Sequence, residues 1–139
     1  MAYNYYIDTQ VNCIFLKQSG EYELGEGLLS LDNILDDPKF RPNLNLLRDL
    51  REVSIPEQYN DIVELKKMRA KMDDYNKYFQ HSLFAWVVGS ATDFALAHRF
   101  CATTRLDGYA TRRPFRELLK ALEWLSIPDD YEIEYPLND

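Results

Sequence analysis

The sequence has few cysteines and no long hydrophobic run, and these shortages exclude several classes of protein. Two cysteines in 139 residues cannot build the disulfide framework of a small secreted scaffold. The longest apolar run, Leu83–Val88, is far shorter than the roughly 20 residues that a membrane-spanning helix needs. The N-terminus lacks the cationic start and apolar core of a secretory signal peptide. We therefore expect a cytoplasmic protein with no membrane span.

Basic residues are also scarce. Sixteen Lys and Arg residues stand against 23 Asp and Glu residues, which gives a net charge of −7. A general nucleic-acid-binding surface must neutralise phosphates, so we expect no nucleic-acid partner. The segment 98–120 is an exception, because it carries six basic and two acidic residues. Arg112, Arg113 and Arg116 form a candidate patch for an anion or an acidic partner, although a solvated helix face and loop is the simpler interpretation.

The hydrophobic content is high enough for a folded domain. Hydrophobic residues make up 46% of the chain and aromatic residues 14%, which argues against intrinsic disorder. A chain of 139 residues fits one domain that buries about 70% of its unfolded surface. We assign residues 1–128 to this single domain and residues 129–139 to an acidic C-terminal tail.

Four segments have the pattern of β-strands, and a fifth is ambiguous. Residues 3–8 alternate between two faces and residues 11–17 follow after a short connection, which predicts an antiparallel hairpin. Residues 44–50 and 83–88 are apolar runs typical of buried strands. Residues 109–113 form either an edge strand or a loop.

Helices are predicted between these strands. Leucines at helical spacing predict the first over residues 21–36, although two glycines weaken its start. Ser54 and Glu57 have the spacing of a capping box, which predicts the start of the second helix. The third is expected over residues 93–105 and the last from Pro114 onward. The order β-β-α-β-α-β-α-(β)-α predicts an α/β fold, a mixed sheet of four to five strands with about four helices.

Four stretches of the chain, taken in order, resemble one known domain. Together they span roughly residues 30–127, and they are Leu35–Pro42 leading to Leu47–Arg51, Trp86–Ala97, Ala97–Phe100 and Pro114–Leu125. Their order and spacing are similar to those of the STAS domain, and more closely to its bacterial SpoIIAA-like (anti-anti-sigma-factor-like) branch. The resemblance implies a STAS/SpoIIAA-like fold and a small non-enzymatic module that binds protein partners or, in some members, small ligands.

The same resemblance draws attention to Ser54. In anti-anti-sigma members a partner kinase phosphorylates a serine at the start of the helix after the third strand, usually within an Asp-Ser-Ser-Gly sequence. The matching stretch here, Arg51–Glu57, contains one serine and departs from that sequence. Ser54 is therefore a candidate phosphorylation site, and a role as a helix N-cap is the simpler explanation.

Polar residues gather where two buried strands are expected to end. Arg51 and Ser54 follow the third strand, whereas Ser90, Thr92 and Asp93 follow the fourth. In open α/β sheets, ligands bind beyond the carboxyl ends of parallel strands. The hypothesis is that these five residues meet at one binding site if the two strands are parallel neighbours, although simple helix caps are the favoured interpretation of Ser90 and Thr92.

No motif in the sequence indicates catalysis, a metal or a cofactor. His98 and Cys101 offer two zinc ligands where three or four are needed, and Gly89–Thr92 lacks the phosphate-loop pattern. We predict a non-enzymatic regulatory or scaffolding protein-interaction module, and both an acidic partner and a homodimer are compatible with the sequence. The alternative is a small-molecule or lipid-binding protein of the same fold, because the abundant aromatic residues would also suit a ligand cavity.

Overall fold

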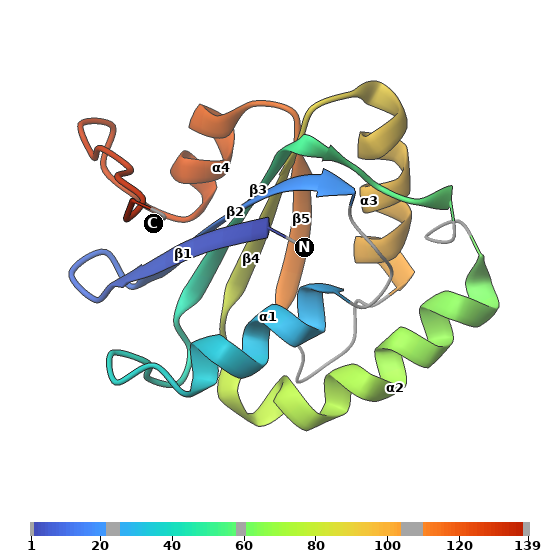
Figure 1. The fold of residues 1–139 in the computed structure, drawn as a ribbon, viewed down its shortest axis with the longest axis horizontal. Helices are drawn as coiled ribbons and strands as arrows, with labels where there is room; N and C mark the ends of the chain where they lie inside the picture. The colour runs from blue at the N-terminus through green and yellow to red at the C-terminus, as the bar shows by residue number, and fades with distance from the viewer. Residues whose placement is uncertain (1, 22–25, 58–60, 104–109, 138–139) are drawn as a thin grey trace.

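The computed structural model describes residues 2–21, 26–57, 61–103 and 110–137, which form one sheet with helices on both faces (Figure 1). The elements follow one another as predicted, and within the ambiguous segment 109–113 the residues from Thr111 onward belong to a strand, whereas residue 109 lies outside the described residues. Within the described residues, no helix is long and apolar enough to cross a membrane. The elements are β1 (Ala2–Asp8), β2 (Cys13–Glu21), α1 (Glu26–Leu35), β3 (Asn45–Ser54), α2 (Ile62–Phe79), β4 (Leu83–Val88), α3 (Ala91–Thr103), β5 (Thr111–Phe115) and α4 (Leu118–Trp124).

The sheet has the strand order β1-β2-β3-β4-β5. β1 and β2 form the predicted antiparallel hairpin, and β2, β3, β4 and β5 run parallel to one another. Leu50 near the end of β3 lies opposite Val88 at the end of β4. Because these strands are parallel neighbours, both of them end at the same edge of the sheet, which was the condition for the predicted sheet-end site.

Helices α1, α2 and α3 pack on one face of the sheet, and α4 with the C-terminal tail packs on the other. The central strands are therefore buried on both faces, which explains why they read as almost continuous apolar runs. The core of the first face includes Ile14, Leu16, Leu46, Leu50, Leu65, Phe84, Trp86 and Phe100. The core of the second face includes Cys13, Phe15, Leu47, Val87, Leu122 and Leu125.

A charged residue, Arg48, is buried within the first face. Its side chain donates to Gln18 Oε1 at 3.0 Å and to Ser30 Oγ at 3.4 Å. The guanidinium carbon lies 5.7 Å from the ring centroid of Trp86. Hydrogen bonds offset part of the cost of burying a charge, so these two contacts favour the observed alignment of β2, α1 and β3 around this residue.

Two predicted boundaries were wrong at the start of the chain. β2 does not end before Ser19 but continues to Glu21, with a register shift between Lys17 and Ser19. Gly20 takes a positive φ of 86° there, a conformation that glycine adopts without strain. The first helix begins at Glu26 rather than Glu21, because Glu21 still belongs to the sheet.

Two predicted helix starts were also wrong. Ser54 is not an N-cap, since it ends β3, where it pairs with Glu21. Helix α2 is instead capped by Asp61, whose side chain accepts from the N–H groups of Val63 and Glu64. Pro114 lies within β5, so α4 begins later, after Glu117. The third helix begins slightly earlier than predicted, and its predicted end at residue 105 lies outside the described residues.

The acidic tail lies against the second face of the sheet, and its described residues, 129–137, form no helix or strand. The Tyr131 ring stacks on Phe15 with ring centroids 5.2 Å apart, and its hydroxyl donates to Asp8 Oδ2 at 2.8 Å. Tyr135 packs edge-on against Tyr6. Aromatic side chains of the tail thus cover β1 and β2, whereas the glutamates between them are exposed to solvent.

Candidate functional site

Two of the predicted sheet-end residues are used to fix the start of α3. The N–H of Asp93 donates to Ser90 Oγ at 3.1 Å, so Ser90 caps the helix. Asp93 is almost fully buried, and its Oδ1 accepts the N–H of Ile55 at 3.2 Å. This bond ties the segment after β3 to the first turn of α3, so both residues have structural partners of their own.

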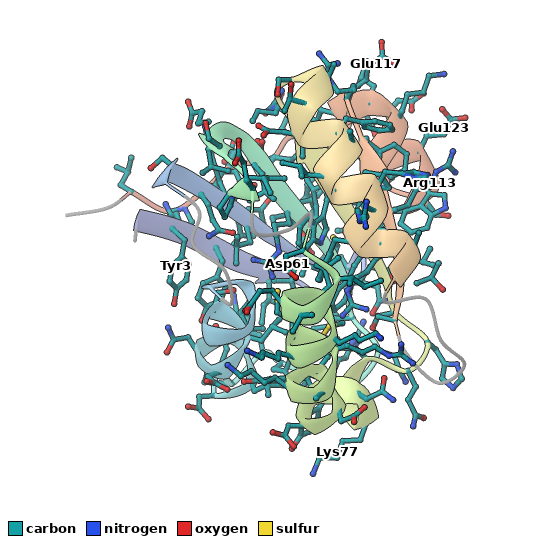
Figure 2. The ribbon with its side chains drawn as sticks, turned by 90° about the vertical axis from the view of Figure 1, so that its right-hand side faces the viewer. Tyr3, Asp61, Lys77, Arg113, Glu117 and Glu123 are labelled. Atoms are coloured by element: carbon teal, nitrogen blue, oxygen red, sulfur yellow. The ribbon has the colours of Figure 1, made fainter. Side chains whose placement is uncertain are left out.

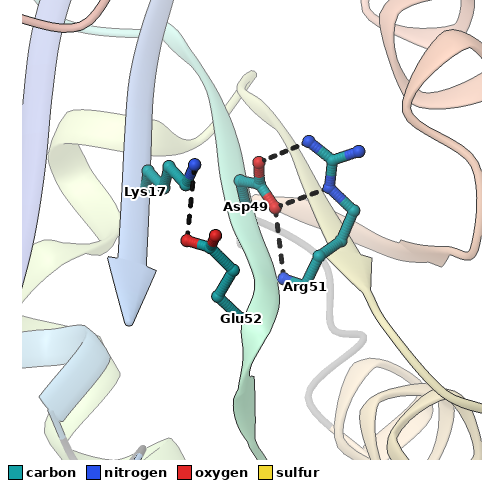
Figure 3. Close-up of polar contacts among 4 residues, drawn as sticks. All are labelled: Lys17, Asp49, Arg51 and Glu52. Carbon is teal, nitrogen blue, oxygen red and sulfur yellow. Dashed lines mark hydrogen bonds and ion pairs between the residues drawn. The ribbon is translucent and has the colours of Figure 1, made fainter. Parts of the chain in front are cut away.

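Arg51 and Ser54 are close to this edge but do not join Thr92. Arg51 lies with Asp49 on the face of β3 that is turned towards the C-terminal tail, and Figure 3 shows the ion pair between them. Arg51 Nε lies 3.0 Å from Asp49 Oδ1, and Nη2 lies 2.8 Å from Oδ2. Ser54 is exposed at the end of β3. Three of the five predicted residues, Ser90, Asp93 and Arg51, therefore have partners within the chain, whereas Ser54 and Thr92 are exposed.

The environment of Asp49 explains how a nearly buried carboxylate stays charged. Burial alone would raise the pKa of Asp49, but hydrogen bonds from the Arg51 side chain and backbone N–H, with the nearby positive charges, lower it. A second ion pair, between Lys17 Nζ and Glu52 Oε2 at 3.3 Å, lies beside it (Figure 3). Each cation of this cluster already has a carboxylate partner, so the cluster is suited to holding strand ends together.

Thr92 lines an open groove of about 1290 Å³ between α2 and α3, which we call the α2–α3 groove. Figure 2 shows Asp61 between these two helices. Ile62 and Val63, in the first turn of α2, are 51% and 57% exposed. The groove is lined by Glu57, Asp61, Ile62, Thr92, Ala95, Leu96, His98, Arg99 and Ala102.

The predicted arginine patch belongs to a second groove, between α3, β5 and α4. It consists of two adjoining hollows of about 970 and 470 Å³, which share Phe94, Arg113 and Pro114. Arg113 points outward in Figure 2, on the same side of the molecule as Glu123. We call this surface the basic groove, and its other lining residues include His98, Cys101, Arg112, Phe115, Arg116, Glu117, Lys120, Glu123 and Trp124.

Within the basic groove the three predicted arginines are not equivalent. Arg112 is half-buried, with its guanidinium 5.0 Å from the Phe84 ring centroid, and it donates to the carbonyl of Ala110. Arg113 and Arg116 are exposed. Successive residues of a strand point to opposite faces, which accounts for the division between Arg112 and Arg113.

The structure adds groove residues that the sequence analysis did not assign to a site, among them Phe94, Lys120 and Trp124. They come from α3 and α4, and the packing of these helices beside β5 brings them to Arg113. Lys120 was counted in the basic segment but was not assigned to a site. No local sequence pattern links Phe94 to Trp124, so only the tertiary fold could reveal this groove.

Two kinds of side chain bear on catalysis, namely the potential metal ligands and the nucleophilic cysteines. The described residues contain no group of three or more His, Cys, Asp and Glu side chains that could hold a metal ion. Burial raises the pKa of the Cys13 thiol, which disfavours a reactive thiolate. Cys101 is also buried, whereas its neighbour on α3, His98, is exposed.

Comparisons with known proteins show the fold. No protein-family model matches the chain, and no curated protein matches it. A solved structure matches with a TM-score of 0.55 and 15% sequence identity, over 89% of this chain and 92% of the other. It is an uncharacterised protein of the DUF3478 family from Shewanella loihica PV-4 with a SpoIIAA-like fold. The present chain therefore has a SpoIIAA-like fold, as its sequence predicted, and this distant likeness shows the fold alone.

Proposed function

We propose that this protein is a non-enzymatic regulatory or scaffolding module that binds an amphipathic helix of a partner protein in the α2–α3 groove. The observation that carries the proposal is the exposure of Ile62, which lines this groove, and of its sequence neighbour Val63. Two adjacent, largely exposed branched apolar side chains beside a groove are typical of a docking site.

The walls of the groove suit a helix. Ala95 and Ala102 are exposed and lie seven residues apart on α3, so they occupy the same helix face two turns apart. Small side chains at such positions allow a second helix to approach closely. Leu96 is half-buried between them and offers an apolar contact.

The charges of the groove suggest how the partner helix would be oriented. Glu57 and Asp61 contribute acidic side chains on the α2 side, whereas His98 and Arg99 lie on α3. A partner helix with basic residues towards α2 and acidic residues towards α3 would match both walls. Electrostatic matching of this kind selects a partner and its orientation.

The test is capture of partners from a lysate of the source cells by the immobilised chain, with quantitative mass spectrometry. Ile62→Glu places an acidic residue in the first turn of α2, where it is compatible with the helix dipole, so the fold is kept. Leu119→Glu is the matched control, because Leu119 is 72% exposed on α4. We expect a specific protein that wild type and Leu119→Glu capture equally and that Ile62→Glu loses.

Two other outcomes would contradict the proposal. Equal capture of every protein by Ile62→Glu and wild type would show that the groove is not the docking surface. A small molecule or lipid that wild type retains without any protein, and that Ile62→Glu loses, would support the ligand-binding alternative instead.

A further inference from the structure

We infer that the basic groove is a separate binding surface, which takes an acidic, extended segment of a partner protein carrying an aromatic side chain. Its charge is opposite to that of the protein as a whole. The groove is lined by four Arg and Lys side chains and two Glu side chains, in a chain of net charge −7. A local excess of positive charge in an acidic protein attracts a short acidic segment, whereas the rest of the surface would repel a long polyanion.

The exposed cations of this groove have no carboxylate partner among the residues that the structure describes. Among the described residues, Arg113, Arg116 and Lys120 have no carboxylate within 4.0 Å. Glu117 and Glu123 lie in the same groove without pairing with them. Because these three cations form no internal ion pairs, carboxylates of a partner could bind them without displacing an existing contact.

Arg113 is also held in place before a partner arrives. Its guanidinium carbon lies 5.1 Å from the ring centroid of Phe115, and Phe115 in turn packs against Trp124 with ring centroids 5.6 Å apart. A cation supported on an aromatic ring loses less conformational freedom on binding than a freely rotating one. The same arrangement leaves Trp124 only half-buried.

The apolar part of the groove suits an aromatic side chain. Phe94 and Pro114 line both hollows, so they lie where the hollows meet, and Phe94 is half-buried. Rings of Phe94 and His98 stack with centroids 6.3 Å apart, and Trp124 closes the other side. Basic side chains of the groove would lie beside an aromatic side chain placed over Phe94. Carboxylates adjacent to that aromatic residue in the partner sequence would therefore reach these basic side chains.

The groove runs along β5, which favours an extended partner segment that binds through its side chains rather than through its backbone. The two hollows follow β5, which is the last strand of the described sheet. A strand added at such an edge normally binds through a ladder of backbone hydrogen bonds. Pro114 has no N–H and sits within β5, as prolines on edge strands do, so it disfavours a continuous ladder.

The test measures binding of a fluorescein-labelled synthetic peptide of alternating Asp and Glu with one central Trp to the full chain by fluorescence anisotropy. The variant Arg113→Glu/Arg116→Glu should weaken binding at least about tenfold, because two attractive contacts become repulsive. The control Lys66→Glu/Lys71→Glu makes the same change of charge at exposed positions of α2 and should stay within about twofold of wild type. A Lys-rich counterpart of the peptide should bind the groove variant better than it binds wild type.

Three results would overturn the inference. One is equal affinity of the two double variants, which would mean that only net charge matters. Another is equal binding of a peptide whose Trp is replaced by Ser, and a third is full competition by inorganic pyrophosphate, which would point to a small anion site. Ile62→Glu should leave peptide binding unchanged, so failure here and failure of the α2–α3 proposal are distinguishable.

Discussion

Replacement of Gly89 by alanine tests whether the sheet edge beside the candidate sites is packed as tightly as the structure shows. A Cβ atom at Gly89 would lie 2.6 Å from the carbonyl oxygen of Arg51 and 3.4 Å from its carbonyl carbon and Cα. These are backbone atoms of β3, which cannot rotate away as a flexible side chain could. β3 and β4 would therefore have to separate where they end.

The expected cost follows from two opposing effects. Forcing one methyl group into a packed site costs about 1–3 kcal/mol. Gly89 is not among the residues with positive φ, so alanine gains back about 0.4–1 kcal/mol by restricting the unfolded chain. We expect Gly89→Ala to lower the free energy of unfolding by about 1–2 kcal/mol, with an unchanged m-value in urea.

Urea unfolding followed by tryptophan fluorescence measures this change. Because the contact is to the Arg51 backbone, Arg51→Ala should not relieve it, and the two substitutions should be additive within about 0.5 kcal/mol. A Gly89→Ala protein with the wild-type midpoint, or one rescued by Arg51→Ala, would refute the reasoning.

Three further predictions concern stability. The pKa values of Tyr5 and Tyr75 are raised to about 12, mainly by burial and also by hydrogen bonds to carboxylates. The neutral forms are favoured in the folded state, so this contribution is present below about pH 10 and is lost as the pH rises towards 12, and urea midpoints measured at pH 9 and 11 should show it. Tyr131→Phe should cost about 1–2 kcal/mol and speed proteolysis of the tail, since it removes a hydrogen bond to a carboxylate. Ser54→Ala should change stability by less than about 0.5 kcal/mol, whereas Asp61→Ala should cost about 1 kcal/mol because only Asp61 caps α2.

The sequence predicted elements whose pattern is set by local burial. Leu83–Val88 was identified with correct ends because both of its faces are covered and short polar segments flank it. The N-terminal hairpin was predicted because a short connection leaves little choice of pairing. β3 was predicted too short, because its last residues are held by pairing with the end of β2, and such pairing has no local signature.

The candidate sites were harder to predict, for the same physical reason. Proximity to a sheet edge made Ser90, Asp93 and Arg51 candidates for ligand binding, and each is held by a partner within the chain, Ser90 as the helix cap that was the simpler interpretation. Polar residues at strand ends often form hydrogen bonds and ion pairs within the chain, and these contacts stabilise the fold rather than bind a ligand. The exposed apolar pair Ile62 and Val63 was not predicted, because apolar side chains of a helix are ordinarily expected to pack in the core.

Helix α3 forms a wall of both grooves, and this favours the regulatory form of the proposed function over the scaffolding form. The hydrogen bond between the Ile55 N–H and Asp93 ties the start of this helix to the segment after β3, which favours a fixed position of α3 between the two grooves. A helix with its side chains is only about 10 Å across, and His98 borders both grooves. Two partners larger than these grooves would collide across that width. Occupation of one groove should therefore oppose occupation of the other. The acidic partner segment in the basic groove would then compete with the partner helix proposed for the α2–α3 groove.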